Sequence, residues 1–140
     1  MRRCLVVANQ TLGSSELFEE LRSRQAQDED TTYCLVVPGT RTSSSAFWSE
    51  GQARAHARHA LDDALERLHE AGLDATGDVG DEDPVLAVGD VLSHAPFDEI
   101  IVSTFPPGVS RWLHRDLPNR LRRRYGLPVT HVAVVPAHAG

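Results

Sequence analysis

The stretch Ile100–His114, IIVSTFPPGVSRWLH, decides the fold because it joins a buried strand to a helix through a short turn. Its first residues, Ile100–Ser103, form an apolar run of the kind found in strands that are covered on both faces. Ser110 stands after the turn at a helix N-cap position. A turn that cradles a phosphate is usually rich in glycine, whereas this one has two prolines and a single glycine, Gly108. The stretch therefore predicts an α/β junction and leaves open whether the junction binds an anion.

Similar apolar runs recur along the chain, and segments with helical spacing separate them. Strands that alternate with helices predict a doubly wound α/β domain with a parallel sheet, helices on both faces and right-handed crossovers. The length of 140 residues fits one domain, residues 1–140, with a core of its own. The expected strands are Cys4–Ala8, Tyr33–Val37, Asp74–Val79, Ile100–Ser103 and Val129–Val135.

Four helices are expected between these strands. Gly72 and Gly126 stand where the second and fourth helices would end, because glycine favours the left-handed C-cap conformation. Pro84 occupies a position that proline tolerates in a first helical turn. The expected helices are Ser15–Arg24, Ser49–Ala71, Pro84–Ser93 and Ser110–Tyr125.

Composition excludes several classes of function. The net charge of −6 argues against nucleic acid as the main partner. No apolar run approaches the roughly 18 residues that would span a membrane. The first apolar run stops at Asn9, which is too short for the core of a signal peptide. We therefore expect a cytoplasmic protein without a membrane or nucleic-acid partner.

The sequence also lacks the common catalytic motifs. All 14 cationic side chains are arginine, which excludes Schiff-base chemistry and a P-loop lysine within this chain. Cys4 and Cys34 lack zinc-site spacing and are expected to be buried thiols. His56, His59 and Asp63 share a helical stripe that can chelate a metal, but a solvated helix face is the favoured interpretation. These features predict a protein that is not an enzyme and holds no metal.

A basic segment lies near the end of the chain. Between Arg111 and Arg124 there are six arginines and one aspartate, whereas acidic residues gather at Asp28–Asp30 and Asp78–Asp83. The segment can attract an anion locally, or it can be a solvated helix face.

Ligands of open α/β sheets bind beyond the carboxyl ends of strands, where the strand order reverses. The loops after the first, second and fourth strands meet there if the first and fourth strands are neighbours. Ser103 and Thr104 offer hydroxyls, Gly108 allows close backbone approach, and Arg111 can reach an anion; alternatively, Ser110 only caps a helix and Arg111 is solvated. The candidate nucleotide or anion site comprises Ala8, Asn9, Gln10, Val37, Pro38, Ser103, Thr104, Gly108, Ser110 and Arg111.

Three segments together resemble the universal stress protein family. They are RCLVVANQTLGSSELFEEL (3–21), ATGDVGDEDPVLAVGDVLSHAPFDEIIVSTFPPG (75–108) and LPNRLRRRYGLPVTHVAVVP (117–136), and the likeness extends over nearly the whole chain. The resemblance implies a five-stranded parallel sheet in the order 3-2-1-4-5. It further implies a cytoplasmic, usually dimeric protein linked to stress responses. Some members bind ATP through a G-x-x-G, nine-residue, G-S/T motif and an aspartate that ends the first strand.

This chain departs from that ATP motif at each position compared. Asn9 replaces the aspartate, Ser103 and Pro106 replace the glycines, and Asp116–Leu117 replaces the final pair. Proline has no N–H to offer a phosphate, and an aspartate would repel it. We therefore expect ATP binding by the motif to be lost and no cofactor to be required, with ATP, AMP or a single phosphate or sulfate as the alternative ligand.

The last strand should form a sheet edge, which needs covering because an apolar edge invites aggregation. The resemblance implies that the same strand of a second copy covers it, giving a two-fold homodimer. The residues expected at this dimer edge are Val129, His131, Val132, Val134 and Val135.

Three hypotheses about function follow. The first is a non-enzymatic stress-response module that acts through dimerisation and an unidentified protein partner. The second is a nucleotide sensor in which a variant loop, Ser103–Arg111, and the Asn9 amide read ATP or AMP. The third, weak nucleotide hydrolysis, has little support without lysine or a glycine-rich loop, and fold alone does not establish it.

Overall fold

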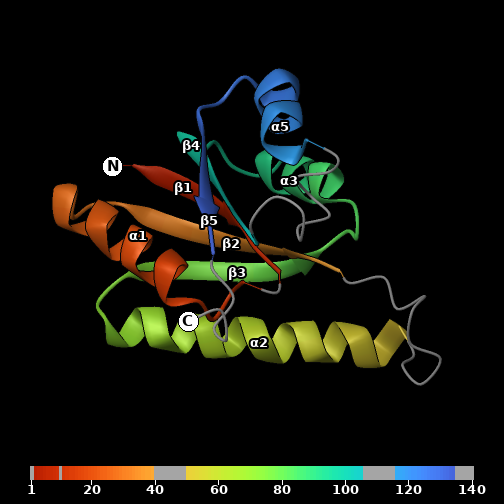
Figure 1. The fold of residues 1–140 in the computed structure, drawn as a ribbon, viewed down its shortest axis with the longest axis horizontal. Helices are drawn as coiled ribbons and strands as arrows, with labels where there is room; N and C mark the ends of the chain where they lie inside the picture. The colour runs from red at the N-terminus through yellow and green to blue at the C-terminus, as the bar shows by residue number, and fades with distance from the viewer. Residues whose placement is uncertain (1, 10, 40–49, 106–115, 135–140) are drawn as a thin grey trace.

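The computed structural model describes residues 2–9, 11–39, 50–105 and 116–134, with the backbone only for residues 50–53. Strands and helices alternate along the chain, as the sequence predicted (Figure 1). The elements are β1 (Arg3–Val7), α1 (Ser15–Gln27), β2 (Thr32–Pro38), α2 (Glu50–Glu70), β3 (Asp74–Gly80), α3 (Pro84–Leu92), β4 (Glu99–Thr104), α5 (Leu117–Tyr125) and β5 (Val129–Ala133).

The five strands form one parallel sheet in the order β3-β2-β1-β4-β5. This confirms the predicted α/β class and the strand order implied by the family resemblance. The order reverses between β1 and β4, which are direct neighbours with Val7 opposite Val102. The chain ends of β1 and β4 therefore lie side by side at the carboxyl edge of the sheet.

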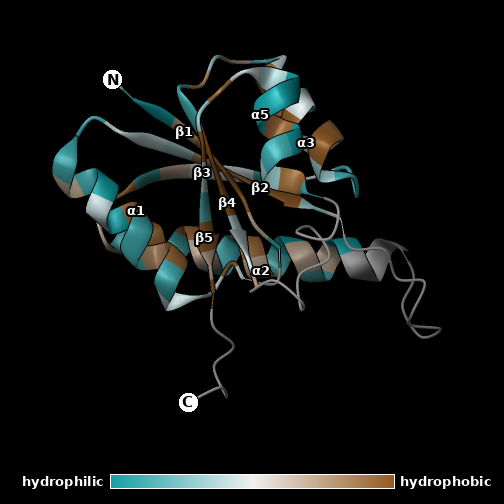
Figure 2. Ribbon diagram, turned by 45° about the horizontal axis from the view of Figure 1, so that its top comes forward, coloured by the Kyte–Doolittle hydropathy of each residue, from teal (hydrophilic) through white to brown (hydrophobic). Residues whose placement is uncertain are grey.

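Helices cover both faces of the sheet (Figures 1 and 2). Helices α1 and α2 enclose one core with Leu17, Leu61 and the side chains of β1 and β2 that point toward them. Helices α3 and α5 enclose the other core, which contains Val88 and Leu121. Both cores are apolar, and burial of such side chains is the main favourable term in folding. The central strands are buried on both faces, which explains their continuous apolar sequence.

The helix ends follow local sequence rules. The Ser14 hydroxyl accepts the backbone N–H of Leu17 at 3.2 Å and caps α1. The Asp83 carboxylate accepts the N–H of Val85 at 2.9 Å and caps α3. Each capping residue stands immediately before the first residue of its helix.

The helix expected at Ser110–Tyr125 is wrong at its beginning. The helix α5 begins at Leu117, and Asp116 before it has a left-handed backbone with φ of 55°. A left-handed residue cannot continue a right-handed helix, and Pro118 then stands in the first turn, where proline is tolerated. Residues 106–115 lie outside the described part of the chain.

Glu99 is a charged residue buried inside the fold, and no local sequence pattern points to it. Its side chain is 3% exposed at the amino end of β4, where it pairs with the guanidinium groups of Arg2 and Arg24. Arg24, from α1, also donates to the Thr130 hydroxyl of β5 at 3.1 Å. A buried carboxylate needs such partners, and these contacts join α1, β4 and β5 at the end of the sheet opposite the candidate ligand site.

The two cysteines lie on opposite faces of the sheet. Cys4 belongs to the core under α1 and α2, whereas Cys34 packs against the core under α3 and α5. Burial raises the pKa of Cys4 to about 11 and also raises the pKa of Cys34. Both are free thiols; Cys4 is buried, as the sequence predicted, whereas Cys34 is only partly buried.

Candidate functional site

The carboxyl edge of the sheet is where ligands of doubly wound proteins bind. The register places the end of β4, with Ser103 and Thr104, beside β1 on one side and β5 on the other. Asn9 follows β1, and Pro38 ends β2. The strand-end residues nominated from the sequence are therefore brought to one edge. Gln10, Gly108, Ser110 and Arg111 lie outside the described residues.

The Ser103 hydroxyl is engaged in a buried contact with Thr11. The two hydroxyl oxygens are 2.7 Å apart, and Thr11 also donates to the Ser103 carbonyl at 3.2 Å. Ser103 is 1% exposed and Thr11 is 4% exposed. The contact ties the loop after β1 to the end of β4 across the point where the strand order reverses. Ser103 therefore points into the protein at this edge and not toward solvent.

The Thr104 hydroxyl has two partners. It donates to the Phe105 carbonyl at 2.8 Å, and it lies 2.5 Å from Nε2 of His131 on β5. Because the single hydroxyl proton is directed to Phe105, the bond with His131 takes its proton from Nε2–H. This arrangement requires a proton on Nε2 of His131.

The electrostatics around His131 disfavour its charged form. Burial lowers the pKa of His131, and the nearby Arg122 guanidinium of α5 lowers it further. Arg122 itself donates to the Val129 carbonyl at 2.8 Å and so holds α5 against β5. His131 was nominated only as a dimer-edge residue, and its link to Thr104 was missed because it depends on the register of β4 against β5.

Asn9 is held by the neighbouring strand. Its side-chain nitrogen donates to the Pro38 carbonyl at 2.9 Å. Ala8 and Val37 are each 1% exposed and contribute to the core. Of the nominated residues that the structure describes, Asn9 is therefore the one whose polar side chain is partly exposed at this edge.

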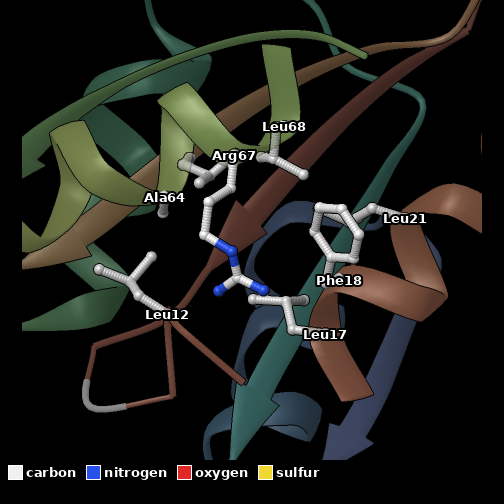
Figure 3. Close-up of a pocket in the computed structure, with 8 residues that line it drawn as sticks. Leu12, Leu17, Phe18, Leu21, Ala64, Arg67 and Leu68 are labelled. Atoms are coloured by element: carbon white, nitrogen blue, oxygen red, sulfur yellow. The ribbon is translucent and has the colours of Figure 1, made fainter. Parts of the chain in front are cut away.

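A small pocket lies away from this edge, between α1 and α2 (Figure 3). The Arg67 side chain extends across it, with its guanidinium 5.1 Å from the centre of the Phe18 ring and donating to the Gly13 carbonyl at 3.1 Å. The cavity volume is about 10 Å³, room for one water molecule at most. Its lining residues are Leu12, Leu17, Phe18, Leu21, Leu35, Ala64, Arg67 and Leu68.

Metal binding finds no support in the described part of the chain, which contains no group of three or more histidine, cysteine or acidic side chains that could hold an ion. His59 instead lies 3.5 Å from Asp63 on the exposed side of α2, and both side chains are mostly exposed. This is the solvated helix face favoured by the sequence. None of the described helices is long and apolar enough to cross a membrane.

Comparison with known proteins gives matches in structure but not in sequence. No model of a protein family matches the chain, and no curated protein matches it. A universal stress protein from Archaeoglobus fulgidus superposes with a TM-score of 0.64 at 13% identity, over 94% of this chain and 93% of the other. A member of that family from Burkholderia pseudomallei gives 0.57 at 17% identity, over 94% and 96%.

A third match is a universal stress protein family member from Arabidopsis thaliana, whose structure contains bound AMP. It superposes with a TM-score of 0.62 at 14% identity, over 96% of this chain and 92% of the other. The three proteins come from an archaeon, a bacterium and a plant, and each match covers almost the whole of both chains. The chain therefore has the fold of the universal stress proteins.

Proposed function

We propose that this protein is a non-enzymatic regulatory module of the universal stress protein type that does not bind ATP through the family's glycine motif. The observation that carries the proposal is the buried Thr11–Ser103 contact. Ser103 stands where the resemblance places the first motif glycine, and glycine serves there by letting the backbone approach a phosphate. A buried side chain anchored to the loop after β1 favours a structural role at that position.

The remaining strand-end groups support the same proposal. The Thr104 hydroxyl is engaged by Phe105 and His131, and the Asn9 amide donates to Pro38. Pro106, the residue at the second motif glycine, has no N–H to donate. Binding a triphosphate needs several hydrogen-bond donors, so the engagement of these groups argues against ATP binding at this edge of the sheet.

Isothermal calorimetry on the purified 140-residue protein tests this proposal. We expect no binding of ATP or AMP with a Kd below about 10 μM, and no nucleotide released when the protein is denatured and analysed by mass spectrometry. Retention of ATP or AMP through purification, or ATP hydrolysis clearly above background, would contradict it.

A nucleotide sensor is the second candidate, and the AMP bound to the Arabidopsis relative favours it. In this case Asn9, which is partly exposed at the carboxyl edge, reads the base or ribose and Arg111 replaces the missing backbone donors. If calorimetry detects AMP, Arg111→Ala should abolish binding, whereas Arg54→Ala on the exposed surface of α2 should leave it unchanged. An unaltered affinity in Arg111→Ala would remove this candidate.

The module is further proposed to be a homodimer through β5. The Pro128 carbonyl accepts the N–H of Ile100, and the N–H of Val134 donates to the Thr104 carbonyl, so the backbone groups of both residues face β4. Along a parallel strand the backbone groups of successive residues face opposite sides. The N–H and C=O groups of His131 and Ala133 therefore face away from β4 along the sheet edge. Val129 and Val134 are buried within the protomer, and Val135 lies outside the described residues. These outward groups are what a second copy of β5 would pair with.

A further inference from the structure

Helix α5 presents three arginines that have no carboxylate partner among the described residues. Arg123 and Arg124 lie three and four residues after Arg120, so the three side chains lie toward one side of the helix. The opposite side is buried through Leu117 and Leu121. We call the three residues the α5 arginine face; in Figure 2 the helix appears largely hydrophilic beside the hydrophobic α3.

The other described arginines almost all have partners. Arg2, Arg22, Arg24 and Arg58 pair with carboxylates. Arg3 and Arg67 lie over phenylalanine rings, and Arg122 donates to Asn119 and Val129. Within the described chain, no carboxylate pairs with the α5 arginine face, although the sequence holds 20 acidic residues against 14 arginines.

Stability of the helix does not require three such charges. A cation near a helix C-terminus interacts favourably with the helix dipole, but like charges four residues apart, such as Arg120 and Arg124, repel each other. An external anionic partner would relieve this repulsion.

An exposed apolar side chain lies on the neighbouring helix. Leu86 of α3 is 51% exposed, and among the described residues no other large hydrophobic side chain is exposed. The hydroxyl of Tyr125, at the end of α5, donates to the carbonyl of the adjacent Val85 at 2.6 Å. The contact places the first turn of α3, which carries Leu86, against the last turn of α5, which carries Arg124.

We propose that the α5 arginine face and Leu86 together form a docking surface for an acidic peptide segment of a partner protein that carries a large apolar residue. The charges match by sign, and the apolar residue of the peptide would cover Leu86. Helix α5 has nine residues, about 13 Å of length, which suits a short segment. Nucleic acid and anionic membranes fit less well, because the whole protein carries a net charge of −6 and repels extended polyanions.

This inference names the kind of partner that the proposed regulatory module would bind, and it rests on the proposed function only for the regulatory meaning of that binding. Its test measures peptide binding, whereas the regulatory proposal is tested with nucleotides, so either can fail alone.

Fluorescence anisotropy with labelled synthetic peptides tests the surface on the 140-residue protein. One probe repeats Glu-Glu-Leu, and a second has serine in place of each leucine. The variant Arg120→Gln/Arg123→Gln/Arg124→Gln should weaken binding of both probes by about tenfold or more. Leu86→Ser should weaken only the leucine-containing probe.

A matched control removes three exposed arginines from the other face of the sheet. The variant Arg22→Gln/Arg54→Gln/Arg58→Gln has the same net charge as the α5 variant and should change affinity by no more than about twofold. Circular dichroism should show that both variants are folded. Equal weakening by the two triple variants would overturn the proposal, as would an absence of peptide binding. Tighter, α5-dependent binding of a short duplex DNA or of phosphatidylserine vesicles would also overturn it.

Discussion

The hydroxyl oxygens of Thr11 and Ser103 lie 2.7 Å apart in the interior, joining the loop after β1 to the end of β4. The two residues are separated by 92 positions in the sequence and meet because β1 and β4 are neighbours in the sheet. The contact buries both hydroxyls at the carboxyl edge of the sheet, the position where this kind of fold usually binds a ligand.

This contact should contribute to stability and not to ligand binding. Thr11→Val should reduce the free energy of unfolding by about 1–2 kcal/mol, because it leaves the buried Ser103 hydroxyl without its partner. Ser103→Ala should cost about 0.5–1 kcal/mol, because the Thr11 hydroxyl keeps its bond to the backbone carbonyl of residue 103. In a double-mutant cycle the two changes should couple by about 1 kcal/mol. Urea denaturation measures both quantities. If either variant instead altered the affinity for phosphate or AMP without a change in stability, a ligand role would have to replace the structural one.

Glu99 should be important for stability despite its distance from the candidate site. Glu99→Ala leaves Arg24 without its buried partner and should cost about 3 kcal/mol in the free energy of unfolding. Glu19→Ala, which removes an exposed partner of Arg22, is the matched control and should cost less than about 0.5 kcal/mol. Equal losses in the two variants, measured by chemical denaturation, would show that burial of Glu99 is not the cause.

His131 should make stability depend on pH. Its pKa in the folded protein is lower than its ordinary value because of burial and Arg122. The unfolded chain therefore binds more protons at mildly acidic pH, and stability falls as the pH drops below about 6.5 and through the lowered pKa.

The variant His131→Gln isolates this effect, since glutamine keeps a donor for Thr104 but does not titrate. The denaturation midpoint should be measured from about pH 7.5 down to about pH 5, an interval that spans the ordinary pKa of histidine. Over this interval the midpoint should fall more steeply in the parent protein than in the variant. Parallel pH profiles would argue against the assignment. The substitution His94→Gln, at an exposed position, controls for histidine loss in general.

The proposed dimer should depend on backbone groups at the edge of β5. Ala133→Pro removes an outward N–H while keeping the bonds between β5 and β4, since proline is accepted on edge strands in this orientation. Light scattering should then report a monomer, whereas Ala133→Ser should remain dimeric. A parent protein that is monomeric at micromolar concentration would refute the dimer itself.

The thiols should be unreactive in the folded state. Burial raises the pKa of Cys4 to about 11, so few molecules carry its thiolate at neutral pH. A thiol reagent at pH 8 should modify Cys4 slowly in buffer and rapidly in denaturant. Rapid modification of Cys4 under native conditions, identified by peptide mass, would indicate local opening of β1.

The order of the elements and the class of the fold could be predicted from the sequence, because strand burial and helix capping leave local patterns. The run CLVVA around Cys4 and the Asp83–Pro84 pair before α3 are examples. The start of α5 was predicted wrongly because the helical spacing before Leu117 outweighed the signal of Pro118, and the left-handed Asp116 cannot be recognised from periodicity.

Local sequence thus determined the alternation of strands and helices and the parallel α/β class, whereas the meeting of the β1 and β4 ends at one edge depends on the strand order. Only the tertiary structure decided what those ends do: that Ser103 turns inward to Thr11, that Thr104 contacts His131, and that the α5 arginines find no acidic partner within the described chain. Propensity and periodicity act over a few residues, whereas these contacts join segments far apart in the sequence and depend on strand order, register and the orientation of each helix on the sheet.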